Sequence, residues 1–366
     1  RLAPLPLPFH HRHKEHQLID IIFITICAIM CGADTWVDIE AFALARKPWL
    51  RNFLKLKNGI PSHDTFSRVF QLLDPQEFQL RFQQWVHSVV DHLPKKTLIA
   101  IDGKTIRRSF SKRDKSDPIH LISAWSSQHN ISLGQIKTNQ KSNEITAIPE
   151  LLKILCLKGC IVSIDAMGCQ KNIAKSICQQ NADYLLAVKQ NQPALFEDIK
   201  LFFDDYLQRD PQSKIFNYCE TVEKDHDRIE TRKYWITSNI QWLIKEHSWH
   251  SLKSIGLVES TRTINGQSST QRRFFITSLD PDVKLFAHSA RAHWSIESSC
   301  HWSLDVSFRE DNSRIRKGHS PENFALVRKL VLSRLKNDAT YKASVNTKRF
   351  RANCDINYLS KLLFTF

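Results

Sequence analysis

The sequence predicts an α/β protein with a helical N-terminal domain and a β-rich insertion in its core. Three observations support this prediction. Apolar residues follow helical spacing up to about residue 94, two apolar runs at residues 98–102 and 160–165 each end on an aspartate, and residues 210–282 are charged and β-rich. We therefore expect four parts, at residues 1–94, 95–209, 210–282 and 283–366.

The composition indicates a polyanionic partner and a reducing compartment. The 366 residues include 52 basic and 37 acidic side chains, for a net charge of +15, which favours a nucleic acid over a generic solubility charge. The nine cysteines are scattered and form no CxxC pair. This spacing predicts free thiols and argues against a disulfide framework or a zinc knuckle.

The most apolar run, residues 21–31, is too short to span a bilayer. We therefore expect a soluble, cytoplasmic protein without a membrane partner. The chain opens with Arg1 and shows no signal-peptide cleavage pattern, which leaves open that the natural N-terminus is missing.

The N-terminal part reads as a series of helices. The first covers residues 14–30, the second starts at an N-cap of Asp34 or Thr35 and stops before Pro48, and a turn at residues 58–62 precedes the third. A fourth opens at residues 74–75 and carries an apolar stripe. The short third helix, with His63 and Arg68, could enter a DNA groove, or this could be a plain packing domain.

The pattern changes to strands after residue 94. Strands are expected at residues 98–101, 120–126 and 131–138, the last two joined as a hairpin. Five further elements follow: a helix at 147–157 with Pro149 in its first turn, a strand at 160–164, a helix at 170–180, a strand at 184–189 and a helix from 193 to about 207. This order matches the ribonuclease-H-like sheet, in which the first and fourth strands lie side by side.

Such adjacency would bring Asp102 and Asp165 together at neighbouring strand ends. A carboxylate at the end of a buried strand is costly unless it is paired or binds a metal, although capping the next turn is a common alternative. Two such carboxylates suit a divalent cation. The basic residues that follow the first of them suit phosphate: Lys104, Arg107 and Arg108.

The C-terminal part predicts a third carboxylate and further basic groups. A helix from about residue 283 past Glu297 carries that acid beside Arg291 and His293, and Arg314 and Arg316 follow an acidic segment at residues 305–311. Residues 321–351 hold eight basic side chains that could form a phosphate-binding surface or a solvated face. Past the strand at 184–189, three polar residues could hold a DNA backbone or form an ordinary polar loop: Lys189, Asn191 and Gln192.

Several ordered blocks of sequence resemble the ISAs-type, H-repeat-associated DDE transposases. The resemblance covers nearly the whole chain. The blocks lie at residues 59–66, 101–104, 142–145, 163–166, 183–189, 226–232, 293–297 and 304–311.

The resemblance implies a ribonuclease-H-like catalytic domain with the β-rich insertion before its final catalytic helix. By position, Asp102, Asp165 and Glu297 match the three catalytic acids, with Asp305 as the alternative third acid. Related transposases carry an arginine four residues before the glutamate and a lysine seven after it, where this chain has His293 and Leu304. Other side chains could substitute for that pair: Arg291, His301 or Arg309.

The resemblance therefore implies the transposase of a bacterial insertion sequence, which cleaves DNA at the element ends and transfers the strands. Two Mg²⁺ ions, with Mn²⁺ as a substitute, would be held by the three acids. The expected partners are double-stranded DNA, as terminal repeats and target, and a second copy of the chain in a nucleoid-associated synaptic complex. Eight candidates for DNA contact are Lys104, Arg107, Arg108, Lys189, Arg291, His293, Arg314 and Arg316.

Two other functions remain open at this stage. A metal-dependent nuclease that cleaves without joining would share all three acids. A catalytically inactive or domesticated DNA-binding remnant would keep the basic groups, and the replacements at His293 and Leu304 favour it mildly.

Overall fold

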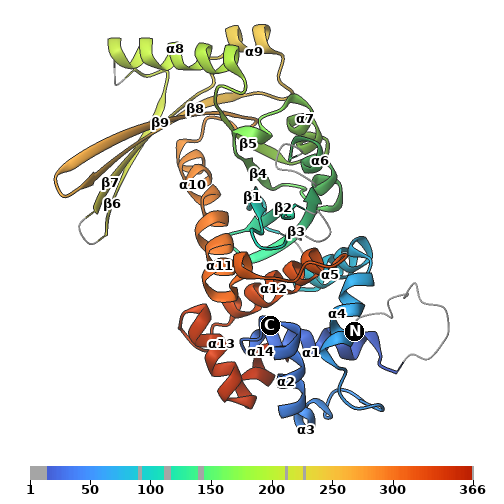
Figure 1. The fold of residues 1–366 in the computed structure, drawn as a ribbon. Coiled ribbons are helices and arrows are strands. Elements are labelled where there is room, and N and C mark those ends of the chain that lie inside the picture. The colour runs from blue at the N-terminus through green and yellow to red at the C-terminus, as the bar shows by residue number, and fades with distance from the viewer. Residues whose placement is uncertain are drawn as a thin grey trace.

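The computed structural model describes residues 15–89, 93–110, 117–138, 144–210, 213–225 and 228–364. It is a mixed α/β structure in which one large sheet stands on a body of helices (Figure 1). The proline- and histidine-rich residues 1–12, which the sequence predicts to be loose, lie outside the described residues.

The nine strands of the sheet run in the order β3-β2-β1-β4-β5-β9-β8-β7-β6. Strands β1, β4 and β5 are parallel to one another, and every other neighbouring pair is antiparallel. In chain order the strands are β1 (Leu98–Thr105), β2 (His120–Ser126), β3 (Ile131–Thr138), β4 (Ile161–Ile164), β5 (Asp183–Val188), β6 (Asn217–Asp225), β7 (Arg228–Thr237), β8 (Ser254–Ile264) and β9 (Gln267–Thr277).

The predicted adjacency of the first and fourth strands is confirmed. Strand β1 pairs with β4 in parallel, from Leu98 opposite Ile161 to Ile101 opposite Ile164. Both strands are apolar and buried up to that point. Asp102 and Asp165 each follow the last paired residue, so their carboxyl groups leave the sheet at the same edge. The predicted hairpin of β2 and β3 is also confirmed.

Helices α6 (Glu144–Ile154) and α7 (Lys171–Gln179) pack on the β1–β5 part of the sheet, whereas α8 (Pro193–Arg209) contacts β9. The prediction for α6 was wrong at its start, because the helix already includes Glu144 and Pro149 lies inside it. A proline inside a helix costs about 3 kcal/mol. Burial of Ile148, Leu151 and Leu152 offsets that cost.

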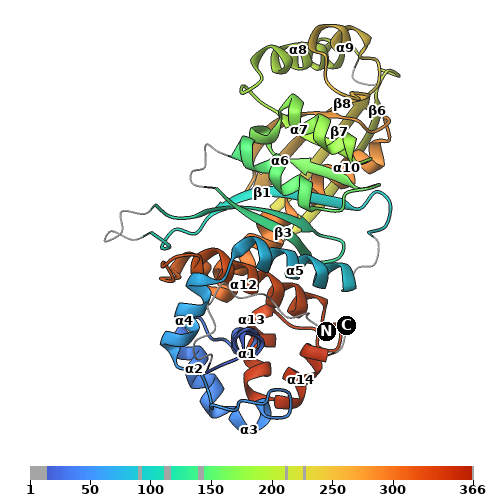
Figure 2. The ribbon, with the colours of Figure 1, turned by 90° about the vertical axis from the view of Figure 1, so that its right-hand side faces the viewer.

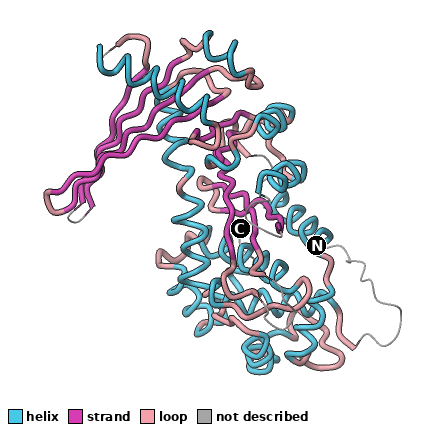
Figure 3. Tube along the Cα trace, turned by 45° about the horizontal axis from the view of Figure 1, so that its top comes forward, coloured by secondary structure: helices cyan, strands magenta, loops and turns pink. Residues whose placement is uncertain are grey.

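The β-rich segment extends the sheet of the core. Strand β9 pairs with β5, from Leu185 opposite Thr277 to Val188 opposite Phe274, and the antiparallel strands β8, β7 and β6 follow it. The far ends of these strands project away from the helices (Figure 3). The sequence prediction missed β6 and the short helix α9 (Gln241–His247).

The N-terminal and C-terminal helices form one body below the sheet (Figure 2). Helix α12 contacts α1, α4, α5 and strand β3. Thr35 caps α2 in a capping box with Asp38, and Ser62 caps α4, as their sequences predict. The helices are α1 (Leu18–Met30), α2 (Trp36–Ala45), α3 (Lys47–Leu50), α4 (His63–Leu72), α5 (Pro75–Val89), α12 (Ser320–Asn337), α13 (Val345–Cys354) and α14 (Ile356–Phe364).

The predicted basic surface of the C-terminal segment is largely wrong, because most of its cationic side chains are buried. Arg349 Nε donates to the carbonyl of Ile29 at 3.0 Å, and Lys348 Nζ donates to that of Leu335 at 2.8 Å. The long apolar stems pack inside while the charged heads satisfy buried carbonyls. Five of the eight are buried: Arg328, Lys329, Arg334, Lys348 and Arg349. Of these, Arg334, Lys348 and Arg349 donate to backbone carbonyls, and Lys329 donates to the side chain of Gln135.

The predicted helix past Glu297 is a chain of three helical segments. Helix α10 (Val283–His293) is capped by Asp282, the π-helix η3 (Ile296–His301) follows after two residues, and α11 (Trp302–Phe308) leads to the 3₁₀ turn η4 (Glu310–Asn312). A π-helical turn shifts the rotational register of the side chains beyond it and is frequent at functional sites. No helix in the described ranges has the length and apolar character to cross a membrane.

Candidate active site

The prediction that the first strand ends on Asp102 was wrong, because β1 continues to Thr105 through its pairing with β2. Asp102 lies in β1 beside the end of β4. Asp165 follows β4 and also caps the short turn η2 (Ala166–Gly168), accepting a hydrogen bond from the Met167 amide at 3.0 Å. The capping role considered as an alternative is therefore present, and it leaves Asp165 beside Asp102.

The negative charge of Glu297 interacts with the charges of Asp102 and Asp165. Burial raises the pKa of Asp102 to about 7. A backbone hydrogen bond from Gly103 lowers this pKa, and the negative charges of Asp165 and Glu297 raise it further. Burial also raises the pKa of Glu297. The positive charge of Arg273 lowers this pKa, and the negative charge of Asp165 raises it further. Carboxylates from β1, the end of β4 and η3 are thus close enough to repel one another.

His301, on the same turn of η3, contacts the first aspartate. Its Nδ1 lies 3.4 Å from Asp102 Oδ2, while its Nε2 is buried without a hydrogen-bond partner among the described residues. Burial lowers the pKa of His301 to about 3, so the imidazole is neutral at physiological pH. Sequence reasoning considered His301 only as a substitute for a family basic residue and missed this contact.

Lys104 occupies a second acidic cluster, formed by Asp305, Glu310 and Asp311. Its Nζ lies 2.7 Å from Asp305 Oδ1, 2.9 Å from Asp311 Oδ1 and 3.4 Å from Glu310 Oε2. The lysine side chain is only 11% exposed. This pairing occupies the ammonium that was predicted to contact DNA, and it places Asp305, the alternative third acid, beside Lys104.

A buried hydrogen-bonded chain supports the strand next to Asp102. His120 Nε2 lies 2.7 Å from Glu144 Oε1, and its Nδ1 lies 2.8 Å from Thr105 Oγ1. A Cβ atom at Gly103 would stand 2.5 Å from both Glu144 Oε1 and His120 Nε2, so only glycine fits there. The charge of Glu144 raises the pKa of both Asp102 and Asp165. Sequence reasoning missed His120, although Glu144 belongs to a block that carried the resemblance.

His293 is directed into the protein. Its Nδ1 lies 2.9 Å from the Ser163 hydroxyl on β4, and burial lowers its pKa to about 4, with a further contribution from Arg273. A neutral, buried imidazole is poorly suited to hold phosphate. This geometry favours a packing role for His293 over its predicted contact with DNA.

The loop after Asp165 is held by two residues that were considered for DNA contact. Asn191 Nδ2 donates to the carbonyl of Ala166 at 2.5 Å, and Gln192 Nε2 donates to that of Cys169 at 2.9 Å. Lys189, just before them, is exposed and lowers the pKa of Asp165. The two amides therefore fix the position of Asp165, and Lys189 remains a candidate for DNA contact.

The other predicted DNA contacts lie at the surface. The side chain of Arg107 is 82% exposed and lies 3.1 Å from Asp311, and Arg108, Arg291 and Arg314 are also exposed. Arg316 is half-buried, stacks on Phe110 at 5.1 Å and donates to the carbonyl of Arg108 at 2.9 Å. No contact with DNA is present, so these roles stay predictions.

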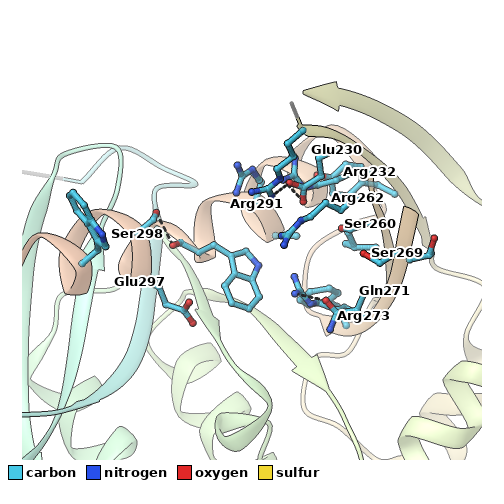
Figure 4. A pocket seen from close by; sticks show the side chains of 18 residues that line it. Glu230, Arg232, Ser260, Arg262, Ser269, Gln271, Arg273, Arg291, Glu297 and Ser298 are labelled. Carbon is cyan, nitrogen blue, oxygen red and sulfur yellow. Dashed lines mark hydrogen bonds and ion pairs between the residues drawn. The ribbon is translucent and has the colours of Figure 1, made fainter. Parts of the chain in front are cut away.

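A cleft of about 670 Å³ lies between strands β7–β9 and the helical segment that carries Glu297. Its walls carry five arginines, of which Figure 4 labels Arg232, Arg262, Arg273 and Arg291 together with Glu297. Sequence reasoning singled out only Arg291 among them, because the strands that place the others were only partly predicted.

The acid cluster has the donor chemistry of a divalent-cation site. Three carboxylates supply the hard oxygen ligands that Mg²⁺ prefers, and their mutual repulsion would be relieved by a cation. In the present geometry, however, no group of three or more His, Cys, Asp or Glu side chains in the described ranges forms a ready ligand set.

Comparison of the chain with known protein families and sequences identifies the family to which it belongs. Residues 93–334 match the family described as "Transposase DDE domain", and residues 1–86 match the one described as "DDE_Tnp_1-associated". The chain is 42% identical over 361 residues to "Putative transposase YncI" of Escherichia coli O157:H7, covering 95% of this chain and 90% of that protein. It is 40% identical over 357 residues to "H repeat-associated putative transposase YhhI" of Escherichia coli K12, covering 95% and 93%.

A solved structure is also similar. The chain aligns with one titled "Cryo-EM structure of piggyBac transposase synaptic complex with hairpin DNA (SNHP)" at 10% identity and a TM-score of 0.43, covering 98% of this chain and 76% of that one. The family matches and the relatives agree with the resemblance that the sequence blocks predict. The chain belongs to the DDE-domain transposases, among the H repeat-associated proteins.

Proposed function

We propose that this chain cleaves DNA at the ends of a bacterial insertion sequence and joins the freed 3′ ends to target DNA. The observation that carries the proposal is the convergence of Asp102, Asp165 and Glu297, whose pKa values are all raised by burial; the other two acids add to the rise at Asp102, and Asp165 adds to the rise at Glu297. Perturbed carboxylates gathered at one sheet edge are typical of catalytic sites.

Asp102, Asp165 and Glu297 would hold two Mg²⁺ ions. When bound, the ions would activate a water molecule or a 3′-hydroxyl and stabilise the leaving oxygen of an in-line displacement. Glu144 and His120 would keep β1 in place behind Asp102. His301 would orient the Asp102 carboxylate through the contact at Oδ2.

The topology supports a ribonuclease-H-like core. In the strand order β3-β2-β1-β4-β5, the first and fourth strands lie side by side as the sequence predicts for that fold, and β1, β4 and β5 are parallel. The β6–β9 ribbon would then be the insertion before the final catalytic helix.

The partners follow from the same proposal. The surface candidates that remain are Arg107, Arg108, Lys189, Arg291, Arg314 and Arg316, and they would contact the phosphates of the terminal repeats and the target DNA. Bringing two element ends together would need a second copy of the chain.

The test is cleavage and joining of a labelled duplex that carries the terminal repeats flanking the gene. The wild-type protein should nick and join this DNA only with Mg²⁺ or Mn²⁺. Asp102→Asn should abolish both products and keep DNA binding. Asp205→Asn is the matched control, because Asp205 is an exposed aspartate on α8 that pairs with Arg209, and it should act as wild type.

Two results would overturn the proposal in different ways. Cleavage without joined products would identify a metal-dependent nuclease. Specific binding of the repeats with no cleavage by the wild-type protein would identify a DNA-binding remnant.

A further inference from the structure

The arginines of the cleft come from one face of the β6–β9 ribbon. Side chains alternate between the two faces of a strand, so residues two apart in β7, β8 and β9 point the same way. Arg228 and Arg232 of β7, Arg262 of β8 and Arg273 of β9 all line the cleft, and Arg291 of α10 closes it from the other side. Arg272, the neighbour of Arg273, pairs with Glu259 and Asp204 and does not line the cleft.

Two of these five arginines have no ion-pair partner within the described chain. Arg232 pairs with Glu223 at 3.0 Å and with Glu230 at 2.7 Å, Arg291 pairs with Glu223 at 3.2 Å, and Arg228 pairs with Glu230. Arg262 is exposed and Arg273 is half-buried, and no ion pair of either is present among the described residues. The cleft therefore keeps an uncompensated positive charge beside Glu297.

Aromatic side chains accompany the charge. Arg273 stacks over the ring of Trp294 at 4.4 Å, which holds the guanidinium in place within the cleft. Trp302 lines the mouth near Glu297 and Ser298 and is 59% exposed. The cleft thus presents a solvent-exposed indole ring in addition to its arginines.

We propose that the cleft binds an unpaired stretch of DNA next to the cleaved phosphodiester bond, with phosphates on Arg262 and Arg273 and a base stacked on Trp302. A guanidinium fork matches phosphate oxygens, and an exposed ring binds bases that have left the double helix. Because Glu297 lies in the same cleft, a strand seated there would continue directly into the catalytic site. The source of that strand rests on the proposed function.

Fluorescence anisotropy with a labelled single-stranded oligonucleotide and its duplex, in EDTA, tests this binding. Arg262→Ala combined with Arg273→Ala should weaken single-strand binding at least about tenfold, because two charged hydrogen bonds to phosphate are lost. The slope of log K against log salt should become shallower by about 1.4, at about 0.7 per phosphate contact. Trp302→Ala should weaken binding about fivefold or more without changing that slope.

The control is Arg272→Ala, which removes the same charge from the opposite face of β9. Arg262→Ala alone serves as a second variant, because this exposed side chain has no fold-supporting partner among the described residues. If the cleft variants lose no more affinity than Arg272→Ala, the assignment of the cleft is wrong. If they weaken duplex and single strand equally, the unpaired-strand assignment is wrong.

The same preparations separate this inference from the proposed function. Asp102→Asn should bind the oligonucleotide as wild type does while cleaving no repeat DNA. Wild-type cleavage together with normal binding by the cleft variants would overturn only the cleft assignment. Single-strand binding that depends on the cleft, in a protein that never cleaves, would overturn only the proposed catalysis.

Discussion

His301 Nδ1 lies 3.4 Å from Asp102 Oδ2, and one helical turn later Asp305 pairs with Lys104 at 2.7 Å. Asp102 and Lys104 are two residues apart in β1, so they share a face of the strand, and His301 and Asp305 share a face of the helix. Strand and helix therefore meet through two matched contacts. This arrangement sets where Glu297, which precedes His301 by four residues, stands relative to Asp102.

The first contact predicts the effect of changing His301. His301→Ala should lower the rate of repeat-DNA cleavage about 10- to 100-fold and raise the Mg²⁺ concentration for half-maximal rate, because the Asp102 carboxylate loses an orienting partner. His301→Asn, whose amide can replace Nδ1, should retain more activity than His301→Gln. His288→Ala, at an exposed position on α10, should change neither quantity. Unaltered Mg²⁺ dependence in His301→Ala would refute the positioning role.

The second contact predicts a stability effect for Lys104→Met. Removing one partner of a buried charge cluster costs about 3–5 kcal/mol, and Glu310 in this cluster is only 1% exposed. Urea denaturation should show this loss at pH 8 and a smaller one at pH 4, because burial raises the pKa of Asp305 and a protonated carboxyl needs no cationic partner. The salt dependence of DNA binding should stay unchanged; a shallower slope would instead show that Lys104 contacts phosphate.

His293 predicts a pH dependence of folding. Its pKa is about 4 in the folded protein, against the ordinary histidine value of about 6.5 in an unfolded chain, so the unfolded chain binds a proton first as the pH falls. Stability from this group is present above pH 6.5 and is lost toward pH 4. Between pH 7 and pH 5, wild type should lose about 2 kcal/mol more in urea denaturation than His293→Asn. Parallel pH profiles of the two proteins would contradict the buried, neutral imidazole.

Gly103 predicts a steric coupling with Glu144. Gly103→Ala should destabilise the protein by about 1–3 kcal/mol, because its Cβ meets the paired ends of Glu144 and His120. In the double variant with Glu144→Ala, which opens the space, the two losses should be clearly less than additive. Gly266→Ala would not serve as a control, because an alanine at the positive φ of 77° found there would itself be strained. Ala147→Gly, on the helix of Glu144, gives the additive reference.

Asp102 predicts that Mg²⁺ binding depends on pH. Since the pKa of its carboxyl is raised to about 7, a proton competes with the cation below that pH. The apparent Mg²⁺ affinity, measured by thermal shift, should be about tenfold weaker at pH 6 than at pH 8. Asp102→Asn should remove most of the shift, and Asp205→Asn should preserve it. An equal Mg²⁺ shift in Asp102→Asn would place the ion elsewhere.

Local sequence signals determined much of the architecture. The apolar runs before Asp102 and Asp165 became β1 and β4, the hairpin formed where β-rich runs flank a polar turn, and the caps at Thr35 and Ser62 begin their helices. These features depend on neighbours within a few residues, where side-chain alternation and capping act directly. The family resemblance rested on such short blocks as well, and it was confirmed.

Tertiary structure decided the features that depend on distant segments. A basic side chain looks the same in sequence whether it reaches solvent or a buried carbonyl, so the burial of Arg349 follows only from the packing of α1 around it. The pairing of Lys104 with acids of α11 and η4 likewise depends on distant segments, and its contact with DNA stays a prediction. The π-helical register that turns His301 toward Asp102 and the cleft that gathers arginines from three strands arise only from packing. By itself, the sequence determined the chain's strands, caps and candidate acids, because these follow from local periodicity. The tertiary structure decided which charges are neutralised and which remain free, because neutralisation depends on burial and on residues distant in sequence.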